Sequence, residues 1–374
     1  MKIAVAIDSF KGSLSSLEAG EAVVRGFRRV FPDGTAVVRP LADGGEGTVD
    51  TLTAGLGGRL VQADVTGPMG APVRAKYGVL PDGRTAVMEM AEAAGITLVD
   101  PAAPNVWRAT TRGVGELVRD ARRRGCTRFL MGIGGSATND AGAGFLQGLG
   151  FRLLDAAGRE IGPGADGLRA LARVERPDDV RSELAGCSFR IACDVTNPLC
   201  GEKGASAVFG PQKGASPTDV PELDAVLRRF AEITGHASEA ESAGAGAAGG
   251  LGFALKAFLG AELAPGAEIV LAETHLEDFI RDADLVVTGE GRLDEQTVMG
   301  KAPIAVARLA KRHGKRVVAF SGCVTPGATA VNAAGIDAFF PILRTVTTLD
   351  EALDPPNAAE NLAATAEQVF RLVK

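Results

Sequence analysis

A chain of 374 residues with 46% hydrophobic and 23% charged side chains has the composition of a globular protein and is long enough for two domains of unequal size. Its net charge of −6 argues against nucleic acid as the main partner, and its apolar runs are too short to span a membrane, so we expect small-molecule ligands and a cytoplasmic location. Its five cysteines form no CxxC pair and fit reduced thiols in or near the core, and its three histidines lack metal-ligand spacing.

The N-terminal segment predicts two strand–loop–helix units. Apolar runs at 3–7 and 36–41 are typical of strands, and a helix is expected over 17–30. The first strand leads into the loop DSFKGS and the second into ADGGEGT. This alternation predicts a parallel sheet.

The middle of the chain has a different pattern. Short apolar runs broken by Gly and Pro, at 61–65, 73–79 and 86–90, predict antiparallel hairpins. A helix is expected over 111–124, with strands at 128–133 and 189–193. The Ala/Gly/Ser-rich segment 237–250 predicts a solvated flexible loop or a hinge. Together these elements indicate a mixed α/β region.

Strand–helix alternation resumes near the C-terminus, with strands expected at 285–288, 316–321 and 338–342. The simplest arrangement is one parallel three-layer α/β domain of Rossmann or flavodoxin-like type, built from residues 1–60 and 275–374. A mixed α/β domain at 61–274 is then an insertion. We expect the active site in the cleft between the two domains.

The two N-terminal loops carry candidate ligand-binding side chains, because parallel sheets bind ligands beyond the carboxyl ends of their strands. Asp8 directly follows an apolar strand and suits a metal or a substrate hydroxyl, while Lys11 suits a phosphate. Asp43 and Glu46 lie among glycines, where metal and hydroxyl binding cannot be separated. An ordinary tight turn is the alternative for both loops.

A third glycine-rich loop, from Met131 to Gly144, predicts a phosphate cradle. It follows an apolar strand and enters a helix, which places backbone amides and a helix N-terminus against an anion. It matches neither GxGxxG nor GxxxxGK[ST], so a dinucleotide site and a P-loop lose support. Its candidate binding residues are Gly134, Gly135, Ser136, Thr138, Asn139 and Asp140.

Two further loops complete the set. Asp194 follows the strand at 189–193, and Lys213 stands beside a glycine where it could reach a phosphate. Near the C-terminus, Glu290 and Asp294 are candidates for Mg²⁺ binding through water. Arg292 or Lys301 would neutralise phosphate beside them, which is the division of labour that phosphoryl transfer requires.

Six motifs in order across nearly the whole chain resemble the series of the bacterial type I glycerate kinase family: DSFKGS, PLADGGEGT, GIGGSATNDAG, CDVTNPL, FGPQKGA, and VTGEGRLDEQT followed by GK. The resemblance implies transfer of a phosphoryl group from ATP to a hydroxyl of D-glycerate with Mg²⁺. It implies 2- or 3-phosphoglycerate as product, and a Rossmann-like domain with an inserted domain. The family favours the 2-hydroxyl, but no residue in these loops selects it.

On this basis Asp194 is the candidate for accepting or orienting the hydroxyl proton, and Lys11 and Lys301 for neutralising phosphate or the glycerate carboxylate. Four carboxylates are candidates for contacts to Mg²⁺ and to hydroxyls, and their roles can be exchanged among them: Asp8, Asp43, Glu46 and Glu290. The alternatives are a kinase of another small hydroxy acid and a non-catalytic nucleotide sensor. A monomer and a homodimer are both open.

Overall fold

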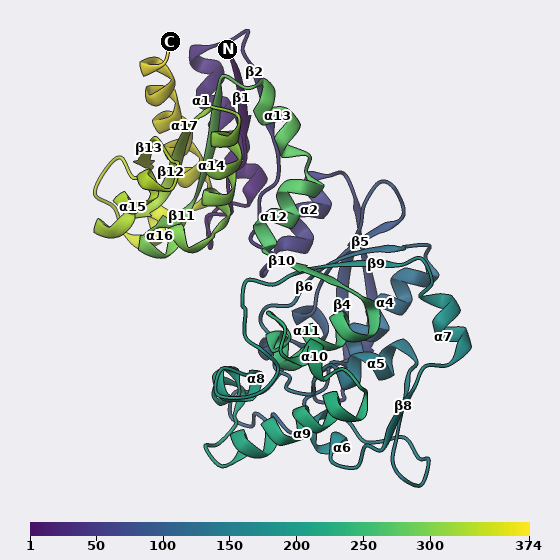
Figure 1. Cartoon of the computed structure of the whole chain (residues 1–374). Coiled ribbons are helices and arrows are strands. Elements are labelled where there is room, and N and C mark those ends of the chain that lie inside the picture. Colours follow the sequence, from purple (N-terminus) through teal and green to yellow (C-terminus); the bar gives the residue numbers. More distant parts are fainter. The chain divides into compact units, whose positions relative to one another are not determined.

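The computed structural model describes residues 1–374, apart from the side chain of Met299. The chain divides into two compact units, which are described one at a time (Figure 1). Unit 1 comprises Met1–Asp43, Ala54–Leu56 and Gly266–Lys374, and unit 2 comprises Gly44–Thr53 and Gly57–Pro265. The domain limits expected from the sequence stay a prediction.

Unit 1 contains a five-stranded sheet in which every neighbouring pair is parallel. The order is β13 (Ala338–Pro341), β12 (Arg316–Val324), β11 (Leu285–Leu293), β1 (Lys2–Val5) and β2 (Thr35–Val38). Numbered along the unit, this is the flavodoxin-like order 2-1-3-4-5, so the predicted α/β class is confirmed. The strand order reverses between β1 and β11.

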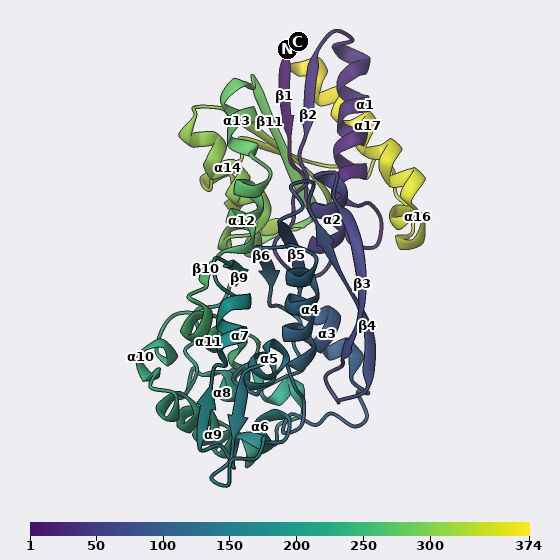
Figure 2. The ribbon, with the colours of Figure 1, turned by 90° about the vertical axis from the view of Figure 1, so that its right-hand side faces the viewer.

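Helices cover both faces of this sheet, because alternate residues of each buried parallel strand point to opposite faces. Ile3, Val5 and Ile7 pack in one core with α1 (Ser16–Val30) and α17 (Pro355–Leu372). On the other face, α13 (Leu276–Asp282) contacts β1 and α14 (Ala302–Arg312) contacts β11 (Figure 2). The remaining helical segments of the unit are α12 (Gly266–Glu273), η3 (Glu295–Met299), η4 (Pro326–Thr329), α15 (Ala330–Ala333) and α16 (Leu349–Leu353).

Unit 2 is built on a mixed six-stranded sheet. Its order is β10 (Glu262–Ala264), β9 (Ser188–Ala192), β6 (Arg128–Gly132), β5 (Thr85–Glu89), β4 (Pro72–Val79) and β3 (Arg59–Thr66). Strands β3, β4 and β5 pair antiparallel, which confirms the predicted hairpins, and β5, β6, β9 and β10 pair parallel. A separate hairpin pairs β7 (Arg152–Leu154) with β8 (Arg173–Glu175).

The core of unit 2 contains aromatic side chains from strands and helices, among them Tyr77, Phe129, Phe145 and Phe253. The remaining helical segments of the chain are α2 (Thr48–Gly55), α3 (Ala91–Ala94), η1 (Ile96–Leu98), α4 (Arg112–Arg123), α5 (Ala143–Leu149), α6 (Gly164–Leu168), α7 (Asp178–Glu183), α8 (Ala205–Phe209), η2 (Pro211–Lys213), α9 (Asp219–Ile233), α10 (Ala237–Ala240) and α11 (Ala247–Leu259). Among the described residues, no helix combines the length and apolar character needed to cross a bilayer.

The expectation of a solvated loop at 237–250 is wrong for most of that segment. The segment contributes α10 and the start of α11, and residues 244–250 are buried. At Gly249, where φ is +64°, a Cβ would lie 2.0 Å from the Thr138 carbonyl oxygen, and the Gly249 carbonyl accepts from the Ala141 amide at 2.9 Å. The small residues are therefore needed for close packing against the loop after β6.

Candidate active site

In unit 1, carboxylates gather where the strand order reverses. Asp8 follows β1, and its backbone amide donates to the Gly289 carbonyl of β11 at 2.8 Å, which ties the two strand ends together. Burial, together with the nearby carboxylates of Asp43 and Glu290, raises the pKa of Asp8 to about 7, while the hydrogen bond from the Ser9 amide and the charge of Lys11 oppose the rise. Such mutual repulsion favours a bound cation at this position.

Glu290 lies near the C-terminal end of β11, and its side chain is buried there. Its side chain is 8% exposed, and Oε1 accepts a hydrogen bond from Thr297 Oγ1 at 2.7 Å. Burial raises the pKa of this carboxyl, and the hydrogen bond from Thr297 and the charge of Lys301 oppose that rise. The preceding Gly289 has φ +154°, and a Cβ there would lie 2.0 Å from the Phe320 carbonyl oxygen, so glycine is required to place Glu290.

Lys301 links Glu290 to the second predicted metal ligand. Its Nζ lies 3.5 Å from Glu290 Oε2 and 3.6 Å from Asp294 Oδ1. Asp294 also caps η3 by accepting from the Gln296 and Thr297 amides, and its Oδ2 lies 3.5 Å from Arg292 Nε. All four residues predicted from this loop therefore belong to one charged cluster.

Two residues that hold these loops were missed in the sequence. Thr297 is the third residue after Asp294, and its hydroxyl accepts from the Asp294 amide while donating to Glu290, so the D-x-x-T spacing was an available signal. In unit 2, Glu89 ends the apolar β5 with 7% exposure, and its carboxylate accepts from the Gly47 and Val49 amides at 3.3 and 2.8 Å. It fixes the loop that carries Glu46, which is itself exposed.

In unit 2, a buried lysine donates hydrogen bonds to the loop that follows β6. Lys213 is 4% exposed, and its Nζ donates to Ser136 Oγ and to the Thr138 carbonyl, each at 2.7 Å. Burial lowers the pKa of Lys213 to about 7, against the opposing charge of Asp140. Gly134 and Gly135 are exposed at the tip of this loop.

Asp140 accepts hydrogen bonds from backbone amides at the start of α5. Its carboxylate accepts from the Gly142 amide at 3.0 Å, from the Gly144 amide at 3.1 Å and from the Thr111 amide at 2.9 Å. Asn139 is buried as well, and its Nδ2 donates to Ser206 Oγ at 2.9 Å. These contacts position the loop, and the direct phosphate contacts expected of Thr138, Asn139 and Asp140 stay predictions.

Asp194 and Lys11 both lie at strand ends and are exposed. Asp194 follows β9 of unit 2, while Lys11 follows β1 of unit 1. Among the described residues, no three His, Cys, Asp or Glu side chains form a preassembled metal cluster. The metal role of Glu290 and Asp294, the proton-accepting role of Asp194 and the predicted cleft between the domains therefore stay predictions.

Comparison with known proteins gives a family match over almost the whole chain. The model of the glycerate kinase family matches residues 3–374. The chain belongs to the glycerate kinase family. A glycerate kinase of Bacillus subtilis (strain 168) is 48% identical, covering 100% of this chain and 98% of the relative. The glycerate 2-kinase of Escherichia coli (strain K12) is also 48% identical, covering 98% of each.

A solved structure agrees with this assignment. The crystal structure from Salmonella typhimurium LT2 that is assigned as glycerate kinase 2 matches with a TM-score of 0.91 at 48% identity, covering 100% of this chain and 98% of that chain. The resemblance seen in the six sequence motifs is therefore confirmed, and so is the α/β fold class.

Proposed function

We propose that this chain transfers the γ-phosphoryl group of ATP to a hydroxyl of D-glycerate. Its membership of the glycerate kinase family over residues 3–374 carries the proposal. The charged loops at the strand ends add chemical support, because phosphoryl transfer depends on positioning and charge neutralisation more than on covalent chemistry.

In unit 1, Lys11 and Lys301 are assigned to the phosphates, and Glu290 and Asp294 to Mg²⁺, with Asp8 and Asp43 nearby. The donor set fits this ion, because Mg²⁺ in kinases is held by one or two carboxylates together with phosphate and water oxygens. Lys301 lies within 3.6 Å of both carboxylates, so it already balances the negative charge that a metal would balance. When bound, Mg²⁺ would neutralise charge on the phosphate oxygens.

In unit 2, Asp194 is assigned to the acceptor hydroxyl, taking or orienting its proton at the carboxylate oxygens. The backbone of Gly134 and Gly135 is exposed and can reach an anion, and Lys213 holds the neighbouring Ser136 by a hydrogen bond to its Oγ. We infer the 2-hydroxyl as the acceptor, since a full-length relative is named glycerate 2-kinase. The need for ATP and the reduced-thiol cysteine pattern support a cytoplasmic location.

Release of ADP with and without D-glycerate tests the proposal. We expect ADP only when both ATP and D-glycerate are present, and loss of turnover when EDTA removes the metal, restored by added Mg²⁺. Phosphorus NMR of the product should give 2-phosphoglycerate. A higher kcat/KM for another small hydroxy acid would contradict the substrate, and 3-phosphoglycerate would contradict the position.

A further inference from the structure

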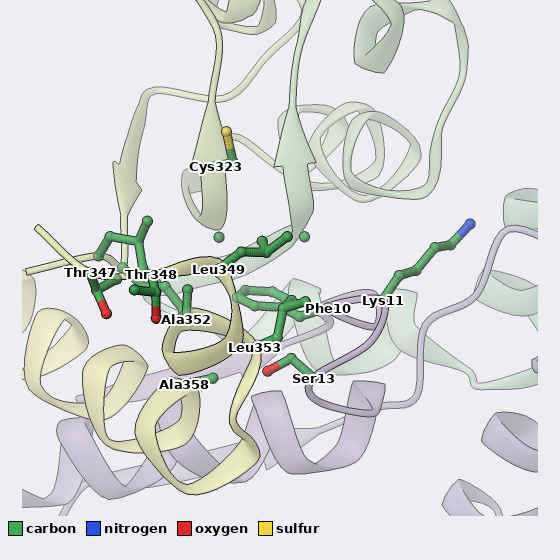
Figure 3. Close-up of a pocket in the computed structure, with 14 residues that line it drawn as sticks. Phe10, Lys11, Ser13, Cys323, Thr347, Thr348, Leu349, Ala352, Leu353 and Ala358 are labelled. Atoms are coloured by element: carbon green, nitrogen blue, oxygen red, sulfur yellow. The ribbon is translucent and has the colours of Figure 1, made fainter.

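A cavity of about 370 Å³ lies in unit 1 beyond the carboxyl ends of the parallel strands (Figure 3). The loop after β1 contributes Phe10 to its wall, β11 contributes Gly291, and β12 contributes Gly322 and Cys323. The segment after β13 and the helix α16 close the opposite side. None of the sequence motifs covers that side of the cavity.

We propose that this cavity binds the nucleoside of ATP, with the triphosphate directed toward Lys11 and the acidic strand ends. The inference rests on the proposed function, since it takes ATP as the phosphoryl donor, and it adds a site for the base and the ribose.

The position of the cavity in the sheet supports this assignment. Open parallel sheets bind ligands outside the carboxyl ends of the strands, at the point where the strand order reverses. In unit 1 that point lies between β1 and β11, and the wall includes Phe10 from the loop after β1 and Gly291 from β11. A cavity volume of about 370 Å³ also falls within the range of roughly 300–1,000 Å³ that is usual for small-molecule sites.

The chemistry of the wall distinguishes between the two reactants. Its side chains are largely apolar, and three of them are exposed: Leu343 at 41%, Leu349 at 73% and Leu353 at 36%. Grouped apolar side chains left in water indicate a binding surface. Glycerate is a small charged hydroxy acid and gains little from such a surface, whereas a purine base is flat and buries well against it.

Two polar groups indicate how the ligand would be oriented. Ser13 contributes to the wall, and its Oγ is buried without a hydrogen-bond partner among the described residues, so a hydroxyl or ring nitrogen of a nucleoside would satisfy it. Lys11 lies across the cavity from Thr347 and Thr348, and its side chain extends away from them (Figure 3). The phosphates are therefore assigned to the Lys11 side.

Alkylation of Cys323 tests the cavity directly. This thiol is exposed and belongs to the wall, whereas the other four cysteines are buried or half-buried. The sequence-based expectation of a core or near-core thiol is wrong for Cys323, which is exposed near the C-terminal end of β12. With ADP at about ten times its Kd, we expect alkylation by N-ethylmaleimide to slow roughly tenfold. The reason is that bound ADP lowers the fraction of protein with an empty cavity by the factor 1 + [L]/Kd. D-glycerate and inorganic triphosphate should leave the rate unchanged, and an unchanged rate with saturating ADP would overturn the inference.

A substitution that fills the cavity gives a second measurement. Ala352→Phe places a ring in the wall, and Ala272→Phe on the exposed surface of α12 is its matched control. By calorimetry, we expect Ala352→Phe to weaken ADP about tenfold or more, or roughly 1.4 kcal/mol, and to leave inorganic triphosphate affinity unchanged. Equal ADP affinity in variant and wild type would contradict the proposal. If Ala352→Phe does not fold, Leu353→Ser removes apolar wall instead and should weaken ADP.

The two proposals can fail separately. Phosphorylation of D-glycerate without protection of Cys323 by ADP would retain the proposed function and overturn the cavity assignment. Protection by ADP without phosphorylation of D-glycerate would retain the cavity assignment and overturn the acceptor.

Discussion

Lys301 lies within reach of two carboxylates, Glu290 and Asp294, so its charge serves both the folded loop and the proposed phosphate. We expect Lys301→Ala to lower kcat/KM for ATP by about 10²-fold or more, as for other lost electrostatic groups at reacting phosphates or oxyanions. Steady-state kinetics measure this. Lys315→Ala, in the same unit, is the control and should change kcat/KM little. Unaltered turnover and KM for ATP in Lys301→Ala would remove this lysine from the phosphate site.

Asp194 is exposed at the end of β9, where a carboxylate can reach a ligand without rearrangement of the sheet. Asp194→Asn keeps the shape of the side chain but cannot accept a proton, so kcat should fall by about 10²–10⁴-fold. The Kd for ADP should stay close to the wild-type value. Asp179→Asn, an exposed carboxylate on α7, should leave kcat unchanged. A near-normal kcat for Asp194→Asn would exclude it as the proton acceptor.

Burial lowers the pKa of Lys213 to about 7 in the folded protein, whereas a lysine in the unfolded chain has a pKa of about 10.4. Between these values the unfolded state binds more protons, so stability rises with pH. From pH 7 to 8.5 we expect a gain of about 1–2 kcal/mol in the wild type that Lys213→Met lacks. Urea denaturation at both pH values measures it. Parallel pH dependence in the two proteins would show that Lys213 stays charged when folded.

At the scale of elements, α1 and α17 approach each other so closely that a side chain would not fit between them. A Cβ on Gly26 of α1 would lie 2.2 Å from the Ala363 carbonyl oxygen of α17. Gly26→Ala should therefore destabilise the protein by about 1–3 kcal/mol, although alanine is the better helix former. Urea denaturation measures the loss. Glu21→Ala, exposed on the same helix, should change stability little, and a stabilising Gly26→Ala would contradict the close packing.

At the scale of the whole molecule, the two units have separate hydrophobic cores. A local loss of packing should therefore remain within one core. In native-state hydrogen exchange, we expect Gly26→Ala to reduce protection of β1, β11 and α17 in unit 1 and to leave β6 and β9 of unit 2 unaffected. An equal loss of protection in both units would show that they unfold as one cooperative body.

Much of the fold could be predicted because it depends on local periodicity. Alternating apolar residues, glycine-rich strand exits and helix caps such as Ser15 before α1 are all visible along the chain. These local patterns predicted the parallel sheet of unit 1, the hairpins of unit 2 and the order of the loops. The order of the motifs also identified the family, because six short patterns in sequence are far more specific than one.

Tertiary packing decided what each loop residue contacts. Lys213 was predicted as a phosphate ligand beside a glycine, and that role stays a prediction. The structure buries Lys213 with its Nζ donating to Ser136 and to the Thr138 carbonyl, contacts that no local pattern encodes. The segment 237–250 has the composition of a flexible linker, yet residues 244–250 are buried because their small side chains let the backbone reach the loop after β6. The sequence by itself therefore determined which residues are available for chemistry at the strand ends. Only the tertiary structure decided which carboxylates lie close together at the end of the sheet and which residues line the cavity in unit 1, because those contacts join segments far apart in the chain.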